Sequence, residues 1–137
     1  MDSAHRHALL EQGLLRAAEQ LGDVTQPVME AFYLRFPDAR AAFDRLALGR
    51  RANLEGEMVA QVLYCLATWF EQPGEVEMVL MGSVPHHAQT LEVRPEWYDG
   101  LIAAGCAVLG GQADGEERAV WDELEAELRA VVRDSMG

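Results

Sequence analysis

Apolar residues recur at intervals of three and four along most of this 137-residue chain, and this spacing restricts the fold more than any other feature. No segment alternates apolar and polar residues as a half-buried strand does. The segment 52–71 has the widest apolar face, which predicts a helix buried over much of its circumference. Two adjacent stripes form that face: Met58, Val62, Cys65 and Trp69, then Val59, Leu63, Leu66 and Phe70. The pattern predicts an all-α fold.

Proline, glycine and capping residues divide this pattern into about seven helices, which we expect to form one domain over residues 1–137. Ser3 is the expected N-cap of the first helix, and Gly22 ends it. Asp23 is expected to cap the second helix, which stops at Pro37. The apolar stripe of the first helix is predicted to contain Leu10, Leu14, Ala18 and Leu21. Later helices are expected over 38–46, 52–71, 76–84 and 95–109 and after residue 117, with Pro85 ending or kinking the helix over 76–84.

The charge balance limits the partners that the chain can have. The sequence contains 23 Asp and Glu residues against 11 basic residues, a formal net charge of −12. So acidic a surface repels nucleic acid and anionic membranes, because both are bound by neutralising phosphates. It suits a basic partner instead, such as a redox protein. The N-terminal residues lack the apolar stretch of a signal peptide, and no apolar run reaches the ~18 residues of a membrane helix. We therefore expect a cytoplasmic protein.

Most of the familiar chemical motifs are missing from the sequence. There is no glycine-rich phosphate loop, no Cys-x-x-Cys, no His-Glu-x-x-His and no pattern typical of a Ser-His-Asp or Cys-His catalytic set. The motifs therefore do not predict an enzyme. Cys65 and Cys106 both lie in apolar helical segments, and we expect two buried, reduced thiols.

Four histidines remain as candidates for a site. His5 and His7 lie near the start of the chain and are expected at the surface. His86 and His87 follow Pro85 in the stretch PHHAQTLEVRPEWY, 85–98. From the spacing alone, a histidine at a helix end is more often exposed or bonded to carbonyl groups than a ligand. A ligand role for one of this pair stays open at this level.

Three segments, taken in order, resemble the globin family. The segment 79–98 is similar to the globin stretch that holds the proximal histidine, and Trp121 matches a tryptophan in the last helix of many bacterial globins. The segment 31–43 carries a globin-like series of aromatic and proline residues: Phe32, Tyr33, Phe36, Pro37 and Phe43. In globins the last of these packs against the haem. The resemblance covers nearly the whole chain, and it implies a single-domain bacterial globin fold of about seven helices around haem b, iron protoporphyrin IX.

The resemblance also implies which residues hold that haem. His87 precedes Val93 by 93 − 87 = 6 residues, the family's spacing between the proximal histidine and an apolar turn residue. His86 is the alternative proximal ligand. A neutral imidazole binds haem iron through one nitrogen while a carbonyl or hydroxyl orients the other. Arg94 and Arg50 are candidate partners for the haem propionates.

On the distal side the chain departs from the family. Met58 falls where globins usually carry a histidine or glutamine, and Val62 lies one turn further along. Met29 falls where bacterial globins often carry a tyrosine. No obvious donor is therefore available for a bound gas, because Tyr33 and Gln61 are near in sequence but need not point inward.

These implications lead to one principal functional expectation and several alternatives. The principal one is a haem protein that reversibly binds a diatomic gas (O₂, NO or CO) in an apolar distal pocket. The first alternative has the Met58 sulfur as a sixth ligand, for electron transfer or redox sensing. The second is a haem-free globin-fold module for signalling or docking. An NO dioxygenase or peroxidase-like side activity ranks below these.

Overall fold

The computed structural model describes residues 2–91 and 93–136, and every regular element in these ranges is an α-helix. The all-α prediction and the expected number of helices are therefore confirmed for the described residues. Within them, no helix is long and apolar enough to cross a bilayer. The helices are α1 (Ser3–Leu21), α2 (Thr25–Arg35), α3 (Pro37–Leu46), α4 (Arg51–Thr68), α5 (Pro73–Thr90), α6 (Pro95–Leu109) and α7 (Gly115–Asp134).

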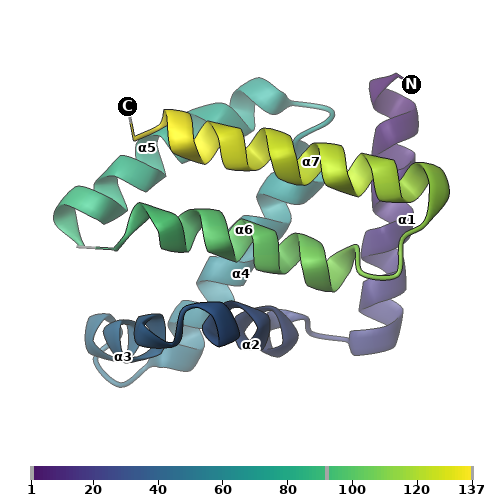
Figure 1. Cartoon of the computed structure of the whole chain (residues 1–137). Helices are drawn as coiled ribbons and strands as arrows, with labels where there is room; N and C mark the ends of the chain where they lie inside the picture. The colour runs from purple at the N-terminus through teal and green to yellow at the C-terminus, as the bar shows by residue number, and fades with distance from the viewer. Residues whose placement is uncertain (1, 92, 137) are drawn as a thin grey trace.

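Helix α6 is the centre of the arrangement. It runs antiparallel beside α7, with α4 behind the pair, α1 at one end and α5 at the other (Figure 1). It contacts α1, α2, α4, α5 and α7, and most of its residues are buried. The predicted stripes of α4 are buried or half-buried as expected, and they face α6 and the other core helices.

The start of the chain differs in detail from the sequence prediction. The N-cap of α1 is Asp2, whose carboxylate accepts a hydrogen bond from the His5 N–H at 2.8 Å, so the prediction of Ser3 is wrong by one residue. The buried face of α1 consists of Leu10, Gly13 and Ala17, whereas Ala18 and Leu21 of the predicted stripe are exposed. At the next helix, the N-cap is Val24 and not Asp23, so this prediction is also wrong by one residue. The Asp23 carboxylate still accepts a hydrogen bond from the Thr25 N–H at 2.9 Å.

Helix α5 is longer than predicted at both ends. It begins at Pro73, inside the expected loop, and it continues through Pro85 to Thr90. Pro85 removes the one N–H that would bond to the Met81 carbonyl. The Met81 side chain is 57% exposed, so this turn faces solvent and its free carbonyl is not buried without a partner. As a result, His86 and His87 lie within the helix and not beyond its end.

Trp121 joins α7 to the first helix. Its side chain is fully buried, and its indole N–H donates to the Glu117 carboxylate at 3.1 Å. A Cβ added at Gly13 of α1 would lie 2.7 Å from the indole nitrogen, so only glycine permits this approach. The buried face of α1 is therefore shifted from the leucine stripe because it must accommodate the tryptophan.

Glu117 is a nearly buried carboxylate held by two neighbours. The Arg16 guanidinium donates two hydrogen bonds to it, at 3.0 and 2.5 Å. These bonds, helped by the Trp121 N–H, hold the pKa of Glu117 below its ordinary value. The folded state therefore favours the ionised carboxylate, which ties α1 to α7.

We expect acidification to weaken this link. A lowered folded-state pKa adds stability that is fully present above the ordinary glutamate value of about 4.3 and is lost as the pH falls through the folded value. Glu117→Gln should therefore show a flatter decline of the unfolding free energy below about pH 4.3 than the wild-type chain. Urea unfolding at a series of pH values measures this, with Glu19→Gln as an exposed control. Parallel pH profiles for wild type and Glu117→Gln would contradict the assignment.

Candidate functional site

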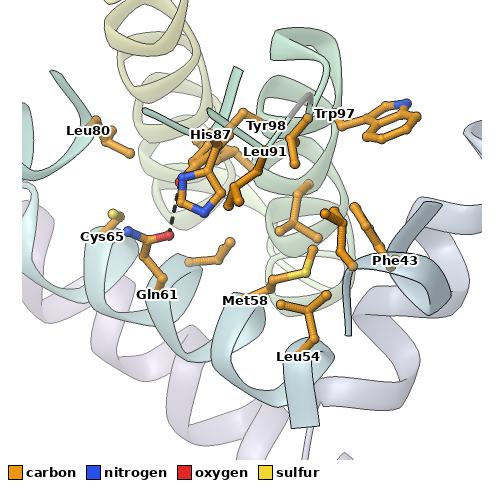
Figure 2. A pocket seen from close by; sticks show the side chains of 15 residues that line it. Phe43, Leu54, Met58, Gln61, Cys65, Leu80, His87, Leu91, Trp97 and Tyr98 are labelled. Atoms are coloured by element: carbon orange, nitrogen blue, oxygen red, sulfur yellow. Dashed lines mark hydrogen bonds between the residues drawn. The ribbon is translucent and has the colours of Figure 1, made fainter. Parts of the chain in front are cut away.

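A cavity of about 180 Å³ lies between α3, α4, α5 and α6. Its lining is mostly aliphatic and aromatic, with a few polar groups at one side, as Figure 2 shows. A cavity lined in this way favours an apolar or partly apolar occupant over water. Phe43 forms part of the wall, and its ring meets the Trp97 ring edge-on at a centroid distance of 5.5 Å.

The structure brings five of the residues singled out from the sequence to this one cavity: Phe43, Met58, Val62, His87 and Val93. They come from α3, α4, α5 and the turn before α6. Met29 does not join them, because its side chain is 1% exposed and lies in the core away from the lining. His86 is exposed and does not line the cavity either.

Val62 owes its position to a glycine on the neighbouring helix. A Cβ added at Gly105 would lie 2.9 Å from a methyl carbon of Val62, so α4 and α6 approach closely at this point. Met58 lies one turn earlier on α4 and reaches the same cavity (Figure 2). The two apolar side chains therefore share one wall.

His87 presents one ring nitrogen to the backbone and the other towards the cavity. Its Nδ1 lies 2.7 Å from the carbonyl oxygen of Ser83, one helical turn earlier. Because a carbonyl only accepts, Nδ1 carries the proton, and in the neutral imidazole Nε2 carries the lone pair. No hydrogen bond to Nε2 is found among the described residues. Figure 2 shows the His87 ring at one wall of the cavity and the Met58 side chain at another wall. An imidazole in this state is ready to bind a metal.

None of the protein-family models, curated proteins or solved structures compared with this chain matches it. The function must therefore be argued from the site itself. Among residues 2–91 and 93–136, no group of three His, Cys, Asp or Glu side chains gathers to hold a bare metal ion. Among the described residues that line the cavity, His87 alone carries an imidazole.

Three polar side chains lie beside His87, and only Gln61 among them was considered from the sequence. Gln61 of α4 lines the cavity and donates to the Ser83 hydroxyl at 3.4 Å. Tyr98 of α6 contacts the Ser83 hydroxyl and donates to the Gln61 carbonyl oxygen at 3.3 Å. Burial raises the pKa of Tyr98, so the phenol keeps its proton. Ser83 and His87 are four residues apart, a signal that the expected helix end at Pro85 concealed.

Tyr33, the other polar residue considered from the sequence, points elsewhere. Its hydroxyl donates to the buried Glu55 carboxylate at 2.6 Å. Glu55 also accepts from Arg51 at 3.3 Å, and Arg51 donates to Asp44 at 2.7 Å. This chain of hydrogen bonds links α2, α3 and α4 behind Phe43. It supports the cavity wall and does not line it.

The N-terminal histidines behave differently from each other. His5 is exposed, as predicted. The prediction of a surface position is wrong for His7, whose side chain is 17% exposed. Its Nε2 lies 2.8 Å from Glu11 and 3.1 Å from Glu71, because α1 packs against the end of α4. Neither histidine lies at the cavity.

The two cysteines are buried and unpaired, as predicted. Cys65 lines the cavity and Cys106 lies in the core of α6. Burial raises the pKa of the Cys65 thiol to about 11 and that of the Cys106 thiol to about 12. Both sulfurs are therefore protonated at neutral pH and are weak ligands and nucleophiles.

Proposed function

We propose that this chain is a globin-type haem protein that reversibly binds a diatomic gas, with His87 as the axial ligand of the iron. One observation carries the proposal: the Nε2 lone pair of His87 faces an apolar cavity while its Nδ1–H is held by the Ser83 carbonyl. The globin-like residues Phe43, Met58, Val62 and Val93 line that same cavity. Separate segments of the chain thus supply the histidine and the apolar residues that a globin-type haem pocket would need.

The residues present fit haem better than a bare metal ion. A porphyrin would supply four nitrogen ligands to the iron itself, so the protein would need to provide one further nitrogen and an apolar wall. His87 provides the nitrogen, and a carbonyl acceptor on its second nitrogen is the usual way to fix the ring. Arg94 lies with its guanidinium 5.2 Å from the Trp97 ring centroid, beside the cavity lining, and is exposed enough to pair with a propionate.

The protein side chains define what a gas would meet at such a centre. When bound, haem iron supplies the position at which a diatomic gas is held. Met58 and Val62 exclude water from the wall of the cavity, and neither donates a hydrogen bond. Gln61 also lines the cavity, but its amide N–H₂ donates to the Ser83 hydroxyl beside His87. A gas that depends on a donor next to Met58 and Val62, such as O₂, should therefore leave quickly or oxidise the iron. CO, which depends less on a donor, is the better probe.

The direct test is to mix the purified chain with haem and record the absorption spectrum in the ferric, reduced and CO-bound states. The proposal expects a Soret band that titrates to one haem per chain and shifts with CO. The absence of any Soret band would overturn it and favour a haem-free module for signalling or docking. Peroxide and NO consumption measured on the same sample would reveal an enzymatic side activity.

A second candidate arises from the place of Met58 in the cavity. Its sulfur lies in the lining with His87, and His/Met ligation favours ferrous iron and a raised reduction potential. In that case the protein would transfer electrons or sense redox state, and its acidic surface would suit a basic redox partner.

Met58→Leu separates the two candidates, because leucine keeps the volume and removes the sulfur. If Met58 ligates the iron, the reduced spectrum should change from split, low-spin bands to a five-coordinate form, and the potential should fall. If Met58 only lines the cavity, the spectrum should stay five-coordinate in both proteins. Met78→Leu, an exposed methionine on α5, is the matched control.

A further inference from the structure

Gln61, Ser83 and Tyr98 form a closed ring of hydrogen bonds, with one residue from each of α4, α5 and α6. The Gln61 amide N–H₂ donates to the Ser83 hydroxyl at 3.4 Å, and the Tyr98 hydroxyl donates to the Gln61 carbonyl oxygen at 3.3 Å. The Ser83 and Tyr98 hydroxyl groups are in direct contact. All three side chains are half-buried.

The chemistry of the three groups fixes the direction of the protons. The Gln61 carbonyl oxygen only accepts, so the bond to it uses the single proton of Tyr98. The contact between the two hydroxyl groups must then use the proton of Ser83. The Gln61 amide proton completes the ring by pointing to the Ser83 oxygen. Both hydroxyl protons are therefore engaged inside the ring.

The ring lies directly against Nδ1 of His87. The Ser83 hydroxyl oxygen is 3.3 Å from this nitrogen, and the Tyr98 hydroxyl oxygen is 3.5 Å from it. With their protons engaged, both oxygens present only lone pairs to Nδ1. They therefore act together with the Ser83 carbonyl, at 2.7 Å, in favouring a proton on Nδ1.

We propose that this ring adds to the Ser83 carbonyl in setting the tautomer of neutral His87, and that Gln61 is the positioning residue that strengthens the preference for a lone pair on the cavity side. Without Gln61, the Tyr98 proton is released and can turn towards Nδ1. In the molecules where it does so, Nδ1 accepts, Nε2 takes the proton, and the side of His87 that faces the cavity loses its lone pair. The Ser83 carbonyl still favours the other tautomer, so the ratio of the two changes and the switch is not complete. The use of this lone pair for iron rests on the proposed haem function, but the tautomer itself does not.

The test is a ¹⁵N NMR measurement of the His87 side chain in the full chain without added haem, with the imidazole neutral. The wild-type protein should show a protonated Nδ1. In Gln61→Met, which keeps the shape and removes both polar groups, the ratio of the Nε2–H to the Nδ1–H tautomer should rise about fivefold, the effect of one ordinary hydrogen bond. The averaged nitrogen shifts report this ratio. Gln89→Met, at an exposed position on α5, the helix that carries His87, should leave the nitrogen shifts of His87 unchanged.

A double variant distinguishes this mechanism from a loss of packing. Adding Tyr98→Phe to Gln61→Met removes the released proton, so the double variant should return towards the wild-type tautomer. Gln61→Leu is the second single variant if the methionine protein does not fold, and it carries the same expectation. Unchanged nitrogen shifts in the folded single variant, or no recovery in the double variant, would overturn the proposal. Failure of the wild-type chain to bind haem would overturn the proposed function and leave this result standing.

Discussion

Replacing His87 with alanine should weaken haem binding by at least about 100-fold, because the substitution removes the axial nitrogen as well as the contacts that orient it. Haem retained by the apolar walls alone should give a broad, shifted Soret band without the signature of a coordinated imidazole. The measurement is a haem titration followed by absorbance, with transfer of haem to a scavenging protein as a second readout. His86→Ala is the matched control, since His86 is exposed and lies outside the cavity lining.

Free imidazole distinguishes a lost ligand from a damaged fold in the same experiment. The His87→Ala cavity has room where the ring stood, so added imidazole should restore the coordinated spectrum. Restoration requires an intact apolar pocket. If His86→Ala loses the Soret band while His87→Ala keeps it, the ligand is His86 and our assignment is wrong.

Trp121→Ala should cause the largest loss of stability, about 3–5 kcal/mol in the free energy of unfolding. The indole is completely buried against Gly13 of α1 and Gly110 after α6, so no neighbouring side chain can fill the space it leaves. The substitution also removes one of the donors to the nearly buried Glu117 carboxylate. Because domains of this kind are stable by only about 5–15 kcal/mol, much of the margin would be lost. Urea unfolding followed by circular dichroism measures the change.

Trp121→Phe is the control for this result. It keeps an aromatic ring between the two helices and removes the N–H, so it should cost clearly less than the alanine variant. If the phenylalanine and alanine variants lose the same amount, the hydrogen bond to Glu117 would matter more than the packing. A loss below about 1 kcal/mol in Trp121→Ala would contradict the central place given to this side chain.

The helices that could be predicted best are those whose apolar residues repeat over several turns. The two stripes of α4 lie inward as the spacing indicated, because a long apolar face is removed from water only when it packs against the core. The stripe of α1 was misplaced because the close approach of Trp121 requires a glycine at Gly13, on the face that the helix buries. A prediction from spacing relies on large apolar residues. It does not detect a helix face that is buried because its residues are small.

Part of the candidate site could also be predicted from the sequence, and part of it could not. Phe43, Met58, Val62 and His87 were brought forward by the resemblance, and the structure places their side chains around one cavity. Met29 is buried in the core and is not part of this lining. A position transferred from a family does not specify how the neighbouring side chains cover it.

Gln61, Ser83 and Tyr98 could not be recognised as a group from the sequence. Their partnership depends on three helices meeting, and on α5 continuing through a proline that usually ends a helix. With the helix expected to stop at Pro85, Ser83 and His87 had no reason to share a face. The correct helix end therefore had to be known before the site could be completed.

The two protonated thiols can serve as probes of how often two parts of the structure open. A thiol reacts with alkylating reagents only as the thiolate, so each cysteine is silent while its surroundings stay closed. Cys65 is part of the cavity wall, whereas Cys106 lies behind it in the core of α6. The rate at which Cys65 is labelled therefore measures how often the wall opens, and the slower rate at Cys106 measures how often the core does. A molecule bound in the cavity should slow the labelling of Cys65 more than that of Cys106. Its binding can therefore be detected even when it absorbs no visible light.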